Sequence, residues 1–210
     1  MTGPESGPVT GLVSRWPLGA DLTDVRDELL AAYATDRGYH DTRHLAEVLD
    51  RVDELRDAGE VFDHQAVTLA AWFHDAVYDG QAGAEERSAQ WALRALAGRP
   101  AAGEVARLVR LTERHLPADD DANGCVLSDA DLAILAASPE RYEEYVADVR
   151  REYAHVPDDL FRPGRAAVLG DLLAKQSLFH TAHAREHWEV PARANVEAEL
   201  LELGGFEARA

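Results

Sequence analysis

The sequence contains almost no cysteine, since Cys125 is the only one among 210 residues. A single thiol excludes an internal disulfide and also excludes a cysteine-rich structural zinc site. Its neighbours Asn123 and Gly124 are typical of a turn, so we expect Cys125 in a turn and assign it no nucleophilic role.

Several other patterns are also missing. The chain has no internal repeat, no glycine-rich phosphate loop and almost no alternation of polar and apolar residues of the kind that marks strands. No apolar run approaches the roughly 20 residues of a membrane-spanning helix. The first residues lack a basic region followed by an apolar one, and we therefore expect a cytoplasmic protein.

Basic residues are outnumbered, with 21 Lys and Arg against 39 Asp and Glu, and the net charge is −18. Such a surface repels phosphate backbones and anionic membranes, which argues against nucleic-acid and membrane partners. A small phosphorylated substrate would need positive charge supplied locally by its site. Only one basic residue, Lys175, is a lysine, and we interpret this as compositional bias and not as function.

Apolar residues recur at helical spacing along most of the chain, which predicts an all-α protein. Residues 1–20 are rich in glycine and proline, so we expect a loose, flexible N-terminal segment followed by a single helical domain over residues 21–210. Asp63 and Ser138 stand where they would cap helices. The apolar patterns fall in the ranges 22–30, 45–55, 66–78, 85–96, 105–111, 127–135, 142–153, 161–173 and 191–203.

The most apolar of these ranges, residues 66–78, runs directly into His74 and Asp75. A buried carboxylate needs a partner, which is either an arginine or a metal ion. A second pair of histidines, His40 and His44, stands four residues apart within the segment Tyr39–His44. That spacing places both imidazoles on one face of a helix.

Two histidines and two aspartates from these segments form a set suited to one divalent ion. The set consists of His44, His74, Asp75 and either Asp129 or Asp131. Mixed imidazole and carboxylate ligands suit Mn, Fe, Co, Ni, Mg or Zn. Such an ion lowers the pKa of a bound water and polarises a phosphoryl oxygen. His40, one turn before His44, would then face the substrate as a proton donor.

The order of these residues resembles the HD superfamily of metal-dependent phosphohydrolases. His40 and His44 are similar to the YHNxxH element of cyclic-nucleotide phosphodiesterases, although Asp41 replaces their asparagine. The similarity is greater to a bacterial group of predicted HD phosphohydrolases, and it extends from about Tyr33 to Leu203. The segments that carry it are RGYHDTRH, WFHDAVYD, EERSAQ, LTERH, SDADLAIL, VRREY and ARANVEAEL.

The resemblance implies a single HD-domain helical bundle and a role for each site residue. It implies His44, His74, Asp75 and Asp131 as metal ligands, with Asp131 favoured over Asp129. Two positions apart on a helix, these two aspartates point to different sides, so only one is expected to reach the ion. The resemblance also gives His40 the place of the general acid.

Two further residues are candidates for substrate binding. Arg37 precedes His40 by three residues and would suit a phosphate, although a surface ion pair is a comparable explanation. His115 stands at a helix end, where a cationic histidine is also favoured by the helix dipole alone. His180, His183 and His187 share a helical face, and we assign them no function.

Together these features predict hydrolysis of a phosphoester in a small nucleotide or another phosphorylated metabolite. The first alternative is a non-catalytic regulator that binds a metal and a nucleotide. A diiron oxygenase is less favoured because His115 is the single histidine between Asp75 and the last aspartate. A helical interaction protein would require all four ligand positions to be coincidental. The sequence leaves open the substrate, the metal and the oligomeric state, homo-oligomers included.

Overall fold

A computed structural model describes residues 8–35 and 37–204, and every regular element in these ranges is helical. The all-α prediction is therefore confirmed. The elements are α1 (Pro8–Ser14), α2 (Thr23–Tyr33), α3 (Thr42–Asp57), α4 (His64–Phe73), α5 (Ala84–Ala95), α6 (Ala102–Leu111), α7 (Ala122–Leu132), the 3₁₀ turn η1 (Ala133–Ala136), α8 (Pro139–Glu152), α9 (Asp158–Ala174), α10 (Ala182–His187) and α11 (Glu189–Glu202).

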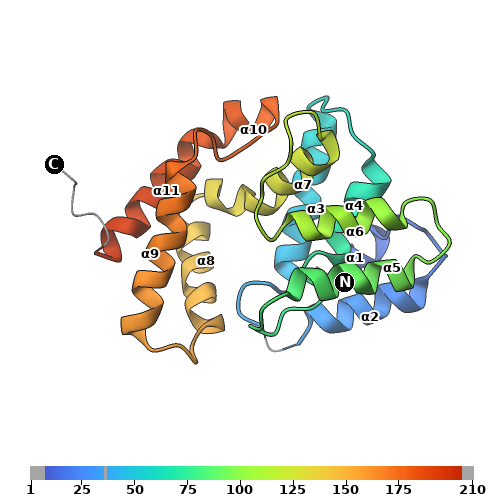
Figure 1. Ribbon diagram of the computed structural model, residues 1–210, viewed down its shortest axis with the longest axis horizontal. Helices are drawn as coiled ribbons and strands as arrows, with labels where there is room; N and C mark the ends of the chain where they lie inside the picture. Colours follow the sequence, from blue (N-terminus) through green and yellow to red (C-terminus); the bar gives the residue numbers. More distant parts are fainter. Residues whose placement is uncertain (1–7, 36, 205–210) are drawn as a thin grey trace, which may run out of the picture.

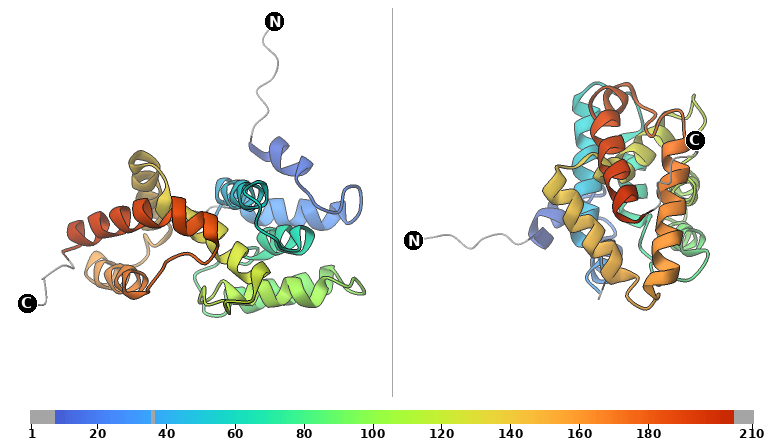
Figure 2. Two further views of the ribbon diagram at one scale, coloured as in Figure 1. Left: turned by 90° about the horizontal axis from the view of Figure 1, so that it is seen from above. Right: turned by 90° about the vertical axis from the view of Figure 1, so that its left-hand side faces the viewer.

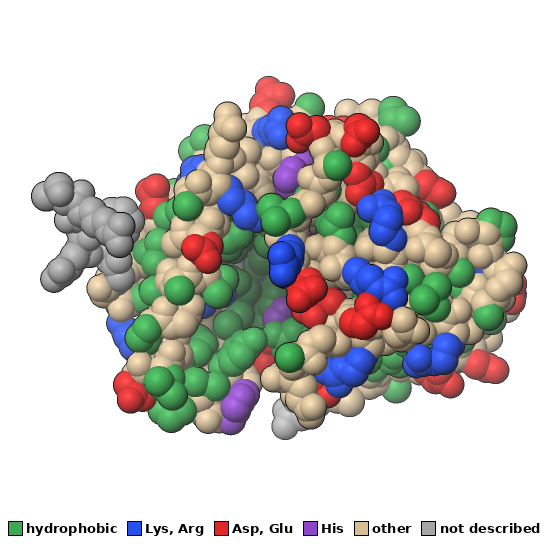
Figure 3. Space-filling model, viewed as in Figure 1, with side chains coloured by type: hydrophobic (Ala, Val, Ile, Leu, Met, Phe, Trp, Pro, Cys, Tyr) green, Lys and Arg blue, Asp and Glu red, His purple; other side chains and the backbone are tan. Residues whose placement is uncertain are grey.

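The helices fall into two groups. Helices α1 to α7 form one, while α8, α9 and α11 form the other, with η1 between them (Figures 1 and 2). The turn η1 contacts α7 on one side and α8 and α11 on the other. The molecular surface is hollowed between the two groups (Figure 3). No helix in the described part of the chain is both long and apolar enough to cross a bilayer.

Helix α4 is the centre of the first group because its sequence is apolar on every side. All residues from Ala66 to Phe73 are buried, and α4 contacts α3, α6 and α7. Helix α3 is amphipathic and buries Leu45, Val48 and Leu55 among others. A helix that is apolar all round has to lie inside the protein, so His74, which directly follows α4, is carried into the interior.

Side-chain caps fix where α4 and α8 begin. The Asp63 carboxylate accepts the N–H of Ala66 at 3.1 Å at the start of α4, and the Ser138 hydroxyl accepts the N–H of Arg141 at 3.4 Å in α8. Both residues are the caps expected from the sequence. Each such cap satisfies an N–H group that the helix itself leaves without a partner, typically stabilising it by about 1 kcal/mol.

The N-terminal segment differs from the loose chain expected over residues 1–20. Its described part includes α1, and the side chains of Leu12 and Trp16 are buried. The Trp16 ring meets that of Trp72 edge to face, with ring centroids 5.1 Å apart, and its indole N–H donates to the carbonyl of Asp21 at 2.8 Å. Aromatic contacts of this kind outweigh the low helix propensity of a segment rich in glycine and proline. Residues 1–7 lie outside the described ranges, and the single domain over 21–210 stays a prediction.

Several helix boundaries also differ from those expected. Helix α4 ends at Phe73 and not near residue 79, so His74 and Asp75 lie just beyond it. Helix α7 begins at Ala122, because the Asp121 carboxylate accepts the N–H of Gly124 at 3.0 Å, and Cys125 is therefore helical and buried. Helix α9 begins at Asp158, three residues before the predicted range, and includes Pro163.

Glu199 and Arg165 form a buried ion pair that holds the second group of helices together. Their side chains are 5% and 11% exposed, and Arg165 Nε lies 2.8 Å from Glu199 Oε1. The hydroxyl of Tyr142 donates to Glu199 Oε2 at 2.6 Å, and Arg165 Nη2 donates to the hydroxyl of Tyr145 at 3.0 Å. Removing one charge of such a pair leaves the other without compensation.

We therefore expect Glu199→Gln to lower the free energy of unfolding by about 3–5 kcal/mol, measured by urea denaturation. Glu144→Gln is the matched control, because Glu144 is 55% exposed in its pair with Arg43. An exposed pair contributes at most about 1 kcal/mol, so this variant should unfold almost like the unmodified protein. Equal stabilities for the two variants would contradict the structural role of Glu199.

Candidate metal centre

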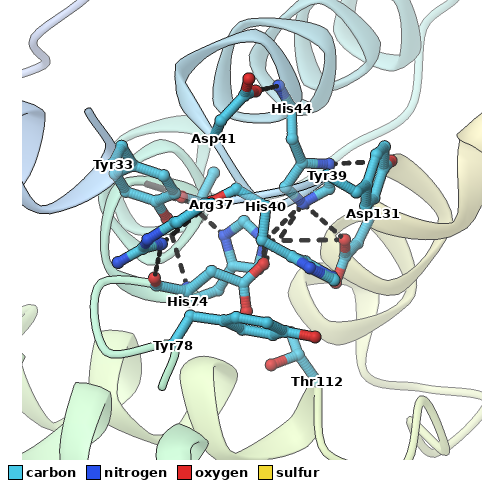
Figure 4. Close-up of polar contacts among 12 residues, drawn as sticks. Tyr33, Arg37, Tyr39, His40, Asp41, His44, His74, Tyr78, Thr112 and Asp131 are labelled. Carbon is cyan, nitrogen blue, oxygen red and sulfur yellow. Dashed lines mark hydrogen bonds and ion pairs between the residues drawn. The ribbon is translucent and has the colours of Figure 1, made fainter. Parts of the chain in front are cut away.

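Three distant segments bring His44, His74 and Asp131 together in the first group of helices. His44 is in the first turn of α3, whose start is fixed by Asp41 accepting the N–H of Arg43 at 2.8 Å. His74 follows α4, and Asp131 lies in the last turn of α7. The ligand atoms of the three residues all lie within 4.8 Å of one another (Figure 4).

The distances between these atoms are those of ligands around one ion. His44 Nε2 lies 3.0 Å from His74 Nε2 and 3.3 Å from Asp131 Oδ1. Asp75 Oδ2 is 3.0 Å from His74 Nε2 and 3.3 Å from His44 Nε2, although Asp75 is not part of the compact three-residue group. Metal–ligand bonds of about 2.0–2.2 Å place neighbouring ligand atoms roughly 3 to 3.5 Å apart.

The hydrogen bonds of the two imidazoles favour a cation between them. His74 Nδ1 lies 2.8 Å from the carbonyl oxygen of Ala71, which accepts its proton and directs Nε2 into the cluster. His44 Nδ1 lies 2.9 Å from the hydroxyl of Tyr39. Both histidines are 1% exposed, so water does not separate the two Nε2 atoms. Two ring nitrogens held this close need a proton or a metal ion between them, and the donor set therefore fits a divalent ion.

The carboxylates of the cluster are held in their charged form. Burial raises the pKa of Asp131, but the charge of His74 and a hydrogen bond from His44 outweigh it, so the pKa of Asp131 lies well below its usual value. Burial likewise raises the pKa of Asp75, but the charges of His74 and His40 outweigh this effect, so the pKa of Asp75 also lies well below its usual value. Ionised oxygens at a buried position are what a hard or borderline cation requires.

The structure separates the roles of Asp129 and Asp131. Asp129 is fully buried, and its carboxylate accepts the N–H of His180 at 2.8 Å and that of Thr181 at 2.7 Å. Burial raises the pKa of Asp129 to about 6, although the N–H groups of Thr181 and His180 favour the carboxylate. Asp129 therefore holds the segment after α9, while Asp131 points into the cluster.

His40 lies beside the cluster and is oriented by Glu152, from the end of α8. His40 Nδ1 is 2.6 Å from Glu152 Oε1, and the ring stacks on that of Tyr78 at a centroid distance of 3.9 Å. Glu152 Oε2 accepts the N–H groups of Gly38, Tyr39 and His40 at 3.1, 2.9 and 3.2 Å. With Nδ1 engaged by the carboxylate, Nε2 remains for proton exchange.

Gly38 permits this close approach to α8. A Cβ atom at this position would lie 2.3 Å from the carbonyl oxygen of Asp148 and 2.5 Å from the Cβ atom of Glu152. Any other residue would therefore push residues 38–40 away from α8, and the three N–H groups would lose Glu152.

Arg37 is engaged by backbone carbonyls, in contrast to the phosphate contact considered from the sequence. Its Nη1 donates to the carbonyls of His40 and Asp75 at 3.0 and 2.7 Å, and its Nη2 donates to that of Ala76 at 3.0 Å. The guanidinium also lies over the ring of Tyr33, whose hydroxyl accepts the N–H of Asp75 at 3.2 Å. Arg37 thus ties the segment that carries His40 to the segment that carries Asp75.

His115 lies next to the cluster on the Asp131 side. Its Nε2 is 3.6 Å from Asp131 Oδ2, and its Nδ1 is 3.2 Å from the hydroxyl of the fully buried Ser128. Burial and the nearby Lys175 lower the pKa of His115 against the opposing charge of Asp131. His115 is 17% exposed, so it is accessible to a ligand bound at the cluster.

Sequence reasoning missed Glu152 and Tyr39, although segments that contain them had been singled out. The VRREY and RGYHDTRH segments include Glu152 and Tyr39, but nothing local reveals that they orient His40 and His44. Two other histidines are engaged elsewhere. His183 pairs with Glu54 at 2.9 Å, and His187 stacks on His183.

Comparisons with known proteins found no match to this chain among family models, curated proteins or solved structures. The functional interpretation therefore depends on the site itself.

Proposed function

We propose that this protein is a metal-dependent phosphohydrolase of the HD type that cleaves a phosphoester of a small nucleotide or another phosphorylated metabolite. The main support is the convergence of the ligand atoms of His44, His74 and Asp131 within 4.8 Å, with Asp75 beside them. Imidazole and carboxylate ligands suit a divalent ion such as Mn, Mg, Fe, Co, Ni or Zn. When bound, such an ion supplies Lewis-acid polarisation of a phosphoryl oxygen and activation of water.

In this proposal His40 is the proton donor to the leaving group. As the bond between phosphorus and the ester oxygen breaks, the proton on His40 Nε2 passes to that oxygen, which leaves as an alcohol. Glu152 supports the charged imidazole through its 2.6 Å contact with Nδ1, and the Tyr78 ring restricts its rotation. General acid catalysis of this kind contributes about 10²–10⁴-fold to the rate.

The decisive experiment screens metal-loaded protein against nucleotides and simple phosphate esters, with release of inorganic phosphate as the readout. The blank is Asp75→Ala, and the control is Asp57→Ala, since Asp57 lies at the far end of α3 and is 72% exposed. We expect hydrolysis by the unmodified protein and by Asp57→Ala, and none by Asp75→Ala.

Three outcomes would overturn the proposal. Full activity in an Asp75→Ala variant that has lost its metal would remove the ion from the mechanism. Tight nucleotide binding without product under every metal would indicate a regulatory binding protein. Two irons per chain would indicate the diiron chemistry of the alternative that we considered less favoured.

A further inference from the structure

Lys175, the only lysine of the chain, lies half-buried in the loop between α9 and α10, where its ammonium group faces the backbone of His115, a neighbour of Asp131. Its ammonium group lies 3.4 Å from the carbonyl oxygen of His115, which is a long contact for a charged donor. No carboxylate of the described residues lies within ion-pair distance of it. Its charge is therefore not neutralised by a neighbour, unlike that of most arginines here, which form ion pairs. The paired arginines include Arg15, Arg43, Arg87, Arg107, Arg141 and Arg165.

The loop that carries Lys175 is fixed by two charged side chains of α11. Arg193 donates to the carbonyl of Lys175 at 2.9 Å and to that of Leu173 at 3.1 Å. The Glu189 carboxylate accepts the N–H of Leu178 at 3.0 Å and is paired with Arg193 at 2.7 Å. A lysine on a loop held in this way loses little backbone freedom when a ligand binds.

The same loop is also fastened to the helix that supplies a metal ligand. Asp129 holds the N–H groups of His180 and Thr181, and Asp131 stands two residues further along α7. The position of Lys175 is thus set relative to the candidate metal centre from both ends of the loop.

His115 connects Lys175 to the cluster. Its backbone is in the left-handed region, with φ at 50°, an unfavourable conformation for a residue with a side chain. In this conformation the ring lies beside Asp131 while the carbonyl faces the ammonium group of Lys175. Lys175 therefore lies on the Asp131 side of the cluster, whereas His40 is a neighbour of Asp75.

A phosphorylated ligand at this site needs positive charge supplied by nearby side chains. The chain carries a net charge of −18, and the cluster itself contributes two carboxylates. Arg37 directs its guanidinium to backbone carbonyls, and Arg141, which lines the cavity beside His44 and Asp131, is paired with Glu47. Burial lowers the pKa of Lys175, as expected for a cation without a counter-ion.

We infer that Lys175 binds a phosphate oxygen of the substrate, so that the phosphate is held between the metal centre and the ammonium group. This inference rests on the proposed function and names a residue that binds the substrate in it. In this proposal Lys175 has a function, in contrast to our interpretation of the single lysine as compositional bias.

The chain offers an unusually direct test, because reductive methylation with ¹³C-formaldehyde labels only Lys175 and the N-terminal amine. The dimethylated amines keep their positive charge. In the Mg²⁺-loaded protein we expect added inorganic phosphate to shift the lysine ¹³C resonance in a saturable way. The resonance of the N-terminal amine should not move, and it serves as the internal control.

Calorimetry with inorganic phosphate on unlabelled, Mg²⁺-loaded protein supplies the second measurement. We expect Lys175→Met to weaken phosphate binding roughly 10- to 100-fold, as for loss of a charge-assisted hydrogen bond. Arg56→Met is the matched control, since it removes one positive charge from an exposed position near the end of α3 and should bind phosphate normally.

The outcomes separate the two proposals. Equal phosphate affinity in the unmodified protein and Lys175→Met, or a lysine resonance that does not respond, would overturn the role of Lys175 and leave hydrolysis intact. Metal-dependent hydrolysis that is absent from every variant would instead overturn the proposed function, and phosphate binding that still required Lys175 would show an anion site independent of catalysis.

Discussion

Asparagine in place of Asp131 is expected to remove the metal ion from the protein and to abolish hydrolysis. The amide keeps the size of the side chain but replaces the ionised oxygen that lies 3.3 Å from His44 Nε2 with a neutral group. Mutating a residue that only hydrogen-bonds to a metal ligand lowers metal affinity or activity about 10–100-fold. Removing a ligand itself should therefore lower metal affinity more than about 100-fold. Bound metal is measured by elemental mass spectrometry after dialysis, and activity as kcat/KM.

Asp129→Asn is the matched control, because Asp129 lies two residues from Asp131 on the same helix and has a different role. Asp129→Asn should keep its metal but unfold more easily, by about 2–3 kcal/mol, since an amide NH₂ group would face N–H groups of His180 and Thr181. Metal retained in Asp131→Asn, or lost in Asp129→Asn with the fold intact, would contradict the assignment of the two residues.

Asparagine in place of His40 is expected to lower kcat roughly 10²–10⁴-fold for substrates whose leaving group is an alcohol. The loss should be much smaller for p-nitrophenyl phosphate, because nitrophenolate leaves without being protonated. The amount of bound metal should stay unchanged, because His40 contacts Glu152 and Tyr78 and is not one of the three clustered residues His44, His74 and Asp131. Steady-state kinetics on the two kinds of substrate measure the difference.

Two further variants make this test specific. Glu152→Gln should show the same dependence on the leaving group with a smaller loss, because the amide supports the charged imidazole less well. His64→Asn is the neutral control, since His64 is 39% exposed and pairs with Asp53 away from the cluster. Equal losses on both kinds of substrate in His40→Asn would assign His40 to substrate binding and not to proton transfer.

Much of the fold could be predicted because the relevant signals are local. The spacing of Leu45, Val48, Val52 and Leu55 places one face of α3 in the core whatever surrounds it. Asp63 and Ser138 cap their helices through contacts within four residues. The prediction for residues 8–20 differed from the structure because their helix is stabilised by a contact between Trp16 and Trp72, which local sequence does not encode.

The candidate site divides in the same way. By itself the sequence determined the helices and drew attention to the histidines and aspartates, since residue type and spacing are properties of the chain. Only the tertiary structure decided between Asp129 and Asp131 and directed Arg37 to backbone carbonyls. It also paired His40 with Glu152, 112 positions away in the sequence, and brought Lys175 to within 3.4 Å of the carbonyl oxygen of His115. The physical reason is that a partner is chosen by the packing of whole helices against one another, and the free energy of that packing depends on contacts between segments far apart in the chain.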